Sequence, residues 1–381
     1  MKYIFTGGGT LGHTNPAVAV AEKIRKSDSD AKILFIMRNG GGENSIVVEK
    51  GFEITGIPCQ GLIRNSGAKS ILQTMVITVK AISKCIQIVK DYQPDLIFGT
   101  GGYVSFAPLI AGIIKGVPTY VHESNAIPGV VTKLTSKLGA IPLVSNENTQ
   151  RCFKARQKCA VVGTPVTYNF NAIDRKTAKA KLGIPRGRMY IVSFGGSGGA
   201  KAMNDIITEI MQKRSCEYSS ISHLHATGEK YYQEYKEKYP RLANGANGQQ
   251  IVAKIQDMAT HMAAADIIIC RCGAATLAEL AEAGRAAILI PSPNVTDNHQ
   301  YKNAKALVEA KAALMIEEQN LSTQSLENNL TYLADSIRIR SQLEKNIKKF
   351  SKSDSADIIA SMLIKAAKHR LPGFFKRFHK E

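Results

Sequence analysis

The feature that most constrains the fold is a short apolar run followed by a glycine-rich turn and a helix-forming segment. It occurs twice, about half the chain apart. The first copy is Lys2–Thr6 with Gly7–Gly12, and the second is Tyr190–Phe194 with Gly195–Ala200. A strand that enters a helix through glycines is the first unit of a doubly wound α/β fold. With 381 residues available, the sequence predicts two such α/β domains around a cleft.

A further strand–turn–helix unit carries a dense set of candidate binding residues. Ile267–Cys270 is predicted to be a buried strand, and a turn at Gly273–Ala275 follows it. Thr276 is predicted to begin a helix in which Glu279 has the spacing of a capping box, and a second buried strand covers Ala286–Ile290. A helix N-terminus at the carboxyl edge of a sheet attracts a diphosphate. Glu279 is interpreted either as an acceptor for a ribose diol or as a capping carboxylate only.

The first glycine turn also matches a dinucleotide fingerprint, through Gly7, Gly9 and Gly12. That fingerprint needs an acidic residue after the second strand. No carboxylate follows Ile33–Ile36, so a nicotinamide cofactor is disfavoured, although Arg38 would suit a 2′-phosphate.

Polar residues follow several of the predicted strands of the first half. His13 lies just after the first glycines, where it acts either as a general base or as a loop-capping side chain. A helix is expected over Ala17–Arg25, with Pro16 in its first turn. Gly99–Tyr103 is a second glycine turn, and His122–Gly129 is a polar loop after a buried strand and thus a candidate site loop.

The remaining elements are predicted from hydrophobic periodicity and turn residues. Residues 60–69 form a polar loop of the kind that covers a cleft, and the stretch up to Ile173 is the expected hinge. Further strands are predicted at 53–57, 95–98, 119–121, 141–144 and 312–316, with helices at 70–91, 174–182 and from about 323 to 365.

Charge and composition limit the possible partners. The formal net charge is +19, the basic residues are spread along the chain, and there is no tryptophan. Nucleic-acid binding usually needs a localised basic stripe, so an anionic membrane or a diphosphate substrate is favoured over nucleic acid. No apolar run approaches about 18 residues, and the start has no signal-peptide pattern, so we expect a cytoplasmic protein with no transmembrane helix.

The cysteines and the chain end allow two smaller predictions. The seven cysteines form no CxxC pair and have no histidine cluster beside them, so we expect reduced, mostly buried thiols and no metal site. Residues 368–380 are basic and aromatic, which suits either an anionic membrane surface or a disordered tail.

Taken together, these segments resemble the MurG family, the UDP-N-acetylglucosamine transferases that convert lipid I to lipid II in peptidoglycan synthesis. The matching motifs keep the family's order and span nearly all of the chain up to about residue 318. They are GGGTLGHTNPAVAVA from Gly7, GTGGYVSFAPLIAG from Gly99, HESNAIPG from His122, SFGGSGGAKAMN from Ser193, CRCGAATLAEL from Cys270 and NHQYKNAKAL from Asn298.

The resemblance implies a GT-B fold of two doubly wound, Rossmann-like domains. Residues 1–165 would form the acceptor-side domain, joined by a C-terminal helix at about 351–370. Residues 166–350 would bind the UDP-sugar, and 371–381 would form the tail. The implied reaction is an inverting transfer of N-acetylglucosamine from its UDP derivative to the 4-hydroxyl of the muramic acid of lipid I. It would occur at the inner face of the cytoplasmic membrane, without a cofactor or metal.

The resemblance also assigns roles to residues by matching position. His13 would be the first choice as general base and Glu123 the second. Ile255 would contact uracil through its backbone, Glu279 would hold the ribose, and Ser197 would hold the diphosphate. The nucleotide would be lined by Ala274, Ala275, Thr276, Leu277 and Ala278, the sugar would be reached by His299 and Gln300, and the donor would be met from the first domain by Thr10, Leu11, Gly12 and Asn125.

The chain departs from the family pattern at several positions, including Thr164, where the hinge usually has Asn. Leu11 replaces a usual Gly, Thr167 replaces a usual hinge Arg, and Gly198 and His299 each replace a usual Gln. Loss of the hinge Arg removes a charge-assisted contact to the donor.

Three alternatives therefore stay open. One is a related lipid glycosyltransferase of the diacylglycerol type. Another is a UDP-N-acetylglucosamine 2-epimerase, which needs cleft carboxylates, and only Glu123 and Glu279 are candidates. The last is a UDP-sugar-binding protein with weak or lost transferase activity.

Overall fold

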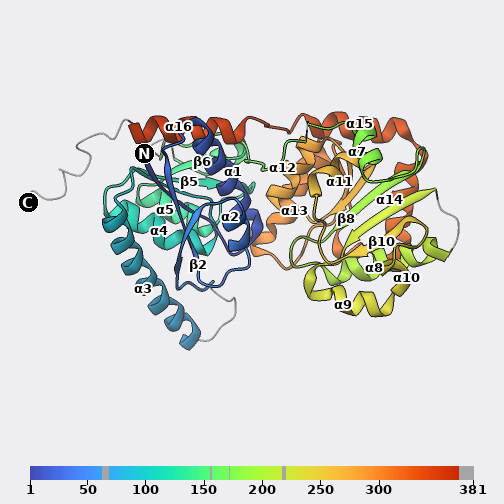
Figure 1. Ribbon diagram of the computed structural model, residues 1–381, viewed down its shortest axis with the longest axis horizontal. Helices are drawn as coiled ribbons and strands as arrows, with labels where there is room; N and C mark the ends of the chain where they lie inside the picture. The colour runs from blue at the N-terminus through green and yellow to red at the C-terminus, as the bar shows by residue number, and fades with distance from the viewer. Residues whose placement is uncertain (62–67, 155–156, 171, 217–219, 369–381) are drawn as a thin grey trace, which may run out of the picture. The chain divides into compact units, whose positions relative to one another are not determined.

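The computed structural model describes residues 1–368, apart from 62–67, 155–156, 171 and 217–219. It consists of two α/β units (Figure 1). The N-terminal unit is Met1–Thr167 with the chain from Lys352 onward, and the C-terminal unit is Tyr168–Ser351. Most of the predicted cleft loop and of the basic tail lies outside the described residues.

The N-terminal unit contains a parallel sheet in the order β3-β2-β1-β4-β5-β6-β7. Its strands are β1 Lys2–Thr6, β2 Lys32–Arg38, β3 Glu53–Ile57, β4 Leu96–Gly99, β5 Thr119–Glu123, β6 Ile141–Val144 and β7 Ala160–Val161. Its helices are α1 Leu11–Ser27, α2 Asn44–Glu49, α3 Ala68–Tyr92, α4 Gly102–Ile114, α5 Val130–Leu138, α6 Glu147–Gln150 and α16 Ser355–Lys368. Helices α1, α2 and α16 pack on the face that carries Phe5 and Phe98, whereas α3 and α4 pack on the opposite face, around Ile4 and Ile97.

The C-terminal unit repeats this arrangement with a parallel sheet in the order β10-β9-β8-β11-β12-β13. Its strands are β8 Met189–Phe194, β9 Ile221–Ala226, β10 Gln249–Val252, β11 Ile267–Cys270, β12 Ala286–Leu289 and β13 Leu314–Met315. Its helices are α7 Arg175–Lys181, α8 Lys201–Cys216, α9 Glu229–Lys238, α10 Pro240–Ala243, α11 Met258–Ala264, α12 Ala274–Ala283, α13 His299–Glu309, α14 Thr323–Asp335 and α15 Ile337–Lys348. The predicted pair of doubly wound sheets is confirmed. Each strand order reverses once, between β1 and β4 and between β8 and β11, and such switch points are where doubly wound folds bind ligands.

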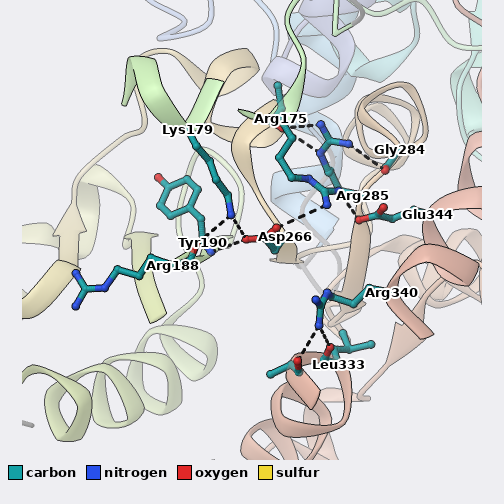
Figure 2. A network of polar contacts seen from close by, with 12 residues as sticks. Arg175, Lys179, Arg188, Tyr190, Asp266, Gly284, Arg285, Leu333, Arg340 and Glu344 are labelled. Atoms are coloured by element: carbon teal, nitrogen blue, oxygen red, sulfur yellow. Dashed lines mark hydrogen bonds and ion pairs between the residues drawn. The ribbon is translucent and has the colours of Figure 1, made fainter. Parts of the chain in front are cut away.

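An ion-pair network fastens the first helix of the C-terminal unit to its sheet (Figure 2). The carboxylate of Asp266 accepts from the backbone N–H of Tyr190 at 2.7 Å and from the ammonium group of Lys179. Arg175 lies 3.6 Å from the same carboxylate and also pairs with Glu344 of α15. The partly buried Asp266 therefore has several partners, as a desolvated carboxylate requires.

Two helices begin earlier than the sequence predicts. Helix α1 begins at Leu11 rather than at Ala17, so Pro16 lies inside it instead of in its first turn. Helix α12 begins at Ala274 with Gly273 as its N-cap and without a side-chain cap, so the predicted capping box at Thr276 does not form. In both cases the helix starts directly after the glycine turn, because the chain must reverse at once to pack on the sheet that it has just left.

Helix α3 also departs from expectation. Residues Ser70–Tyr92 are long and apolar enough to cross a membrane by length and composition alone. The mean hydropathy is 1.3, and 17% of the most apolar 18-residue stretch is buried. The sequence shows no uninterrupted apolar run here, because polar residues, among them Lys80, Lys84 and Lys90, recur along the helix. Ala81, Cys85 and Val89 nevertheless pack into the core, so α3 belongs to the unit and has one apolar face left exposed.

The cysteines agree only in part with their predicted burial. All are free thiols, and Cys85, Cys270 and Cys272 are buried, but Cys152 and Cys216 are exposed. Cys152 follows the short helix α6, and Cys216 is the last residue of α8, so both lie at helix ends rather than on a buried helix face.

Candidate active site

The first glycine turn of the N-terminal unit is held rigidly from two sides. The backbone N–H of Gly9 donates to the buried carboxylate of Glu43 at 2.7 Å. Gly9 has φ +89, and a Cβ there would lie 2.8 Å from the ring of Tyr103, so only glycine fits. Because a carboxylate already occupies this N–H, the turn positions the start of α1 rather than binding a phosphate through Gly9.

His13 lies in the first turn of α1, where the predicted turn meets the end of β4. Its Nδ1 is 2.9 Å from the carbonyl oxygen of Thr100. A carbonyl only accepts, so Nδ1 carries the proton and Nε2 keeps a free lone pair. The side chain is partly exposed. His13 is therefore oriented through Nδ1, which leaves Nε2 as the ring nitrogen that could take a proton from a substrate.

Glu123 ends β5, and its carboxylate is fully occupied by the loop that follows. Oε1 accepts from the backbone and the side-chain amides of Asn125, at 3.0 and 2.9 Å. Oε2 accepts from the backbone of Gly129 and the hydroxyl of Thr132, both at 2.8 Å. With 4% of its surface exposed, Glu123 has the contacts of a residue that shapes the loop, and these contacts favour His13 as the base.

The switch point of the C-terminal unit contains a cavity of about 340 Å³. Its wall combines backbone of the second glycine turn with two cationic side chains, Lys201 and Arg271, and polar groups from the ends of β11 and β12. The lining residues are Gly195, Gly199, Ala200, Lys201, Ala202, Tyr231, Arg271, Ser292, Asn294, Gln300 and Glu318. Glycine backbone with adjacent cations is suited to a diphosphate.

Gln300 and Arg271 fix the loops that form this cavity. The side-chain oxygen of Gln300 accepts from the backbone N–H groups of Cys272, at 3.2 Å, and Ser292, at 2.9 Å. Its oxygen is thus occupied, and its amide NH2 remains as the hydrogen-bond donor of this side chain. Arg271 donates to the carbonyl of Pro291 at 3.1 Å and pairs with Glu318, so it also ties the loop after β12 to the end of β11.

Helix α12 presents its N-terminus at the same edge. Ala274, Ala275, Thr276 and Ala278 are partly exposed, whereas the side chain of Leu277 is buried. Leu277 can therefore face a ligand only through its backbone, and the same holds for Ile255, which is 4% exposed.

Glu279 lies in the second turn of α12, and its side chain is only partly exposed. Desolvation by the surrounding protein raises the pKa of Glu279 to about 7. Since the capping box is absent, Glu279 is not a capping carboxylate. A perturbed carboxyl at a switch point is typical of a binding group.

The structure thus gathers the predicted residues into two groups. Thr10, Leu11, Gly12, His13, Glu123 and Asn125 belong to the N-terminal unit, and Ser197, Ile255, Ala274–Ala278, Glu279, His299 and Gln300 belong to the C-terminal unit. Ser197 is exposed and does not line the cavity, whereas Gln300 does.

Several residues that line the cavity carry no signal in the local sequence pattern used above. These are Lys201, Tyr231, Arg271, Ser292, Asn294 and Glu318. Arg271, Ser292 and Asn294 follow the ends of β11 and β12, so a search of every residue just after a predicted strand would have found them.

Two doubly wound units and a cation-lined cavity at a switch point define a two-domain enzyme of the nucleotide-sugar class, and comparison with known proteins gives its family. The glycosyltransferase family 28 N-terminal domain matches residues 3–140, and the family 28 C-terminal domain matches residues 190–362. The chain belongs to the MurG family, the UDP-N-acetylglucosamine–N-acetylmuramyl-(pentapeptide) pyrophosphoryl-undecaprenol N-acetylglucosamine transferases.

Relatives that carry this enzyme name match nearly end to end. The relative from Acetivibrio thermocellus is 36% identical, over 98% of this chain and 100% of its own length. That from Thermoanaerobacter sp. (strain X514) is 36% identical, over 95% of this chain and 99% of its own. The crystal structure of Acinetobacter baumannii MurG is similar, with a TM-score of 0.71 and 25% identity over 96% of this chain and 99% of that one.

Proposed function

We propose that this chain transfers N-acetylglucosamine from UDP-N-acetylglucosamine to the muramic acid of lipid I, giving lipid II. The observation that carries the proposal is the 36% identity over the full length of an enzyme with that name. The cavity at the β8/β11 switch point supports a nucleotide-sugar donor, because it combines glycine backbone with Lys201 and Arg271.

The donor would bind mainly through the C-terminal unit. The cavity cations and the N-terminus of α12 would receive the diphosphate. Glu279 would accept from the ribose hydroxyls, and the backbone of Ile255 would meet uracil. The free amide of Gln300 would donate to the sugar, with His299 beside it in the chain.

The reaction would be a single displacement with inversion. The 4-hydroxyl oxygen of the acceptor attacks the anomeric carbon of the donor, and its proton passes to Nε2 of His13. The bond from the anomeric carbon to the diphosphate oxygen breaks, and its electron pair leaves with UDP. The charge that develops on UDP would be stabilised by Arg271, Lys201 and the helix N-terminus. Glu123 would act through the shape of its loop.

The acceptor is linked to a lipid, and we propose that the protein docks peripherally on the inner face of the cytoplasmic membrane. The supporting surface is the exposed apolar face of α3, α4 and α5 in the N-terminal unit. It consists of Ile71, Leu72, Met75, Val76, Val79, Ile114, Val130, Leu134 and Leu138, which are 41–70% exposed. The exposed Lys80, Lys84, Lys133 and Lys137 lie on the same helices, so charge complementarity favours an anionic bilayer as the partner.

The function is tested by measuring UDP release from UDP-N-acetylglucosamine, with and without a short-chain lipid I analogue. Release that depends on the acceptor and fails with UDP-glucose is the expected result. Preference for UDP-glucose would point to another lipid glycosyltransferase. Conversion of the donor sugar without an acceptor would point to an epimerase. Binding of UDP-sugar without turnover would leave only the binding-protein alternative.

A further inference from the structure

A chain of polar side chains runs through the otherwise apolar core beneath α8. Ser193 of β8, His223 and His225 of β9, and Asn204 of α8 are each at most 1% exposed. The hydroxyl oxygen of Ser193 lies 2.7 Å from Nε2 of His223 and 2.8 Å from Nδ1 of His225. Nε2 of His225 lies 3.0 Å from Oδ1 of Asn204, and Nδ2 of Asn204 donates to the carbonyl of Thr227 at 2.9 Å.

The carbonyl of Thr227 at one end fixes the direction of the two hydrogen bonds made by Asn204. Since Thr227 only accepts there, Asn204 donates through Nδ2, and its Oδ1 accepts from Nε2–H of His225. Nδ1 of His225 lies 2.8 Å from the hydroxyl and 3.2 Å from the carbonyl oxygen of Ser193. Burial keeps this ring neutral with its proton on Nε2, so Nδ1 accepts from the hydroxyl of Ser193, which accepts in turn from Nε2–H of His223. Both imidazoles are thus neutral, and burial lowers the pKa of both, that of His225 to about 4.

This series of hydrogen bonds ends at the carbonyl of Thr227, which lies against the glycine turn that lines the cavity. A Cβ on Gly199 would lie 2.1 Å from the carbonyl oxygen of Thr227, and one on Gly228 would lie 2.6 Å from the backbone of Gly199. The two turns therefore touch backbone to backbone. The turn Thr227–Gly228 is held from its other side by the segment after β10, through Thr227 N–H to Val252 at 3.0 Å and Gly228 N–H to Ala253 at 3.1 Å.

This contact matters because a turn with four glycines has little intrinsic order. The N–H of Gly199 donates to the carbonyl of Gly196 at 3.0 Å within the turn. The other glycines, Gly195, Gly196 and Gly198, leave N–H groups that a ligand could approach, but the entropy of fixing them opposes binding. A neighbouring turn that is itself fixed by a buried, fully directed set of hydrogen bonds removes part of that cost before the ligand arrives.

We propose that Asn204 and His225 are positioning residues for donor binding. Through Thr227 and Gly228 they hold the turn Gly195–Gly199 in the conformation that receives the diphosphate of the UDP-sugar. Neither side chain touches the donor. The inference rests on the proposed function, in which this turn lies beside the diphosphate.

The test compares UDP binding and donor kinetics of Asn204→Ala with the wild-type enzyme. The variant removes both hydrogen bonds of the amide, and we expect the Kd of UDP and the KM of the donor to rise roughly five- to tenfold. Because the chemical step does not use Asn204, kcat at saturating donor should stay within about twofold. The milder variant Asn204→Ser should change Kd in the same direction, and it serves if Asn204→Ala does not fold.

The matched control is Met211→Ala on the same helix. Met211 is buried in the apolar cluster of the C-terminal unit, so its truncation lowers stability without removing a hydrogen bond of the chain. An unchanged Kd for the Asn204 variants, or an equal rise in Kd for Met211→Ala, would overturn the proposal. Failure of the wild-type enzyme to bind UDP would instead overturn the proposed function.

Discussion

At the scale of single residues, hydrogen bonds separate two candidates that the sequence left equivalent. His13 and Glu123 both follow strands of the first sheet, and the resemblance makes both candidates for the general base. Glu123 accepts four hydrogen bonds from its own loop, whereas His13 uses only Nδ1 and keeps Nε2 available. A carboxylate with every strong acceptor site filled is a poor base, because proton uptake would break those bonds.

We therefore expect His13→Ala to lower kcat by about 10²- to 10⁴-fold, the usual contribution of a general base. The Kd of UDP should not change, because the proposed donor site lies in the other unit. Turnover in the UDP-release assay and calorimetric binding of UDP measure the two effects. Near-normal kcat in a folded His13→Ala protein would remove His13 from the mechanism.

Glu279 gives a prediction with a defined pH dependence. Its pKa in the folded protein is raised from 4.5 to about 7 by burial, so the protonated form dominates just below neutrality. Ribose hydroxyls donate to a carboxylate and favour its ionised form. UDP binding at about pH 6.5 should therefore release protons, which calorimetry in buffers of different ionisation enthalpy detects.

The matched variant is Glu279→Gln, which should bind UDP more weakly and without proton release.

The raised pKa of Glu279 also affects the stability of the folded protein. Because the folded pKa lies above the unfolded one, folding favours the neutral form, and this contribution is lost as pH rises from about 4.5 to about 7. Equal proton release by wild type and variant would exclude Glu279 as the ribose ligand.

At the scale of elements, the main feature is the exposed apolar face of α3, α4 and α5, which arises from several helices together and not from any single residue. On α3 the exposed apolar residues lie at positions 71, 72, 75, 76 and 79, which share one side of a helix. The opposite side carries Ala81 and Cys85, which pack on the sheet. In Figure 1 the first turns of α3 extend past the other helices of its unit. Exposure of these apolar side chains to water is unfavourable, so their burial against a partner surface would be favoured.

We expect the double variant Leu72→Asn with Val79→Asn to bind anionic vesicles at least tenfold more weakly, since each exposed side chain loses about 1 kcal/mol or more of burial in the bilayer. Co-sedimentation at low salt measures the change. Ile337→Asn is the matched control, because Ile337 is 73% exposed but belongs to the C-terminal unit.

Deletion of residues 369–381 separates this face from the basic tail. If the deletion abolishes sedimentation and the double variant does not, the tail and not the α3–α5 face is the anchor. Substitution of Lys133 or Lys137 by Glu should weaken binding by about 1 kcal/mol each, and less at high salt.

At the scale of the whole molecule, each unit has its own core. The N-terminal core lies on both faces of its sheet and includes Ile359 and Leu363 of α16. Lys23 of α1 also lies 2.6 Å from Asp357 of α16. The C-terminal core is built on Ile191, Ile269 and the helices α8 and α14. Two separate cores allow the units to unfold separately.

Calorimetric unfolding in UDP should therefore show one transition that moves and one that does not. Ligand at about 100 times its Kd stabilises the unit that binds it by about 2.7 kcal/mol, and we assign that unit as the C-terminal one. In Asn204→Ala, the same concentration of UDP should raise the unfolding temperature of the C-terminal unit by less than in the wild-type protein. Equal movement of both transitions would mean that UDP binding also involves the N-terminal unit or that the two cores unfold together.

The sequence by itself determined the two sheets and most of their strands, because buried parallel strands are short apolar runs and glycine turns mark where they end. It also determined the family, through motifs at the strand ends. Only the tertiary structure decided where α1 and α12 begin, since the return of the chain to its own sheet set those starts rather than a polar cap. It likewise revealed Lys201 and Arg271 in the cavity at the β8/β11 switch point, the engaged carboxylate of Glu123, and the buried path from His225 to Gly199. Each of these depends on which residues from distant segments come within hydrogen-bond distance. Local sequence patterns do not determine those distances.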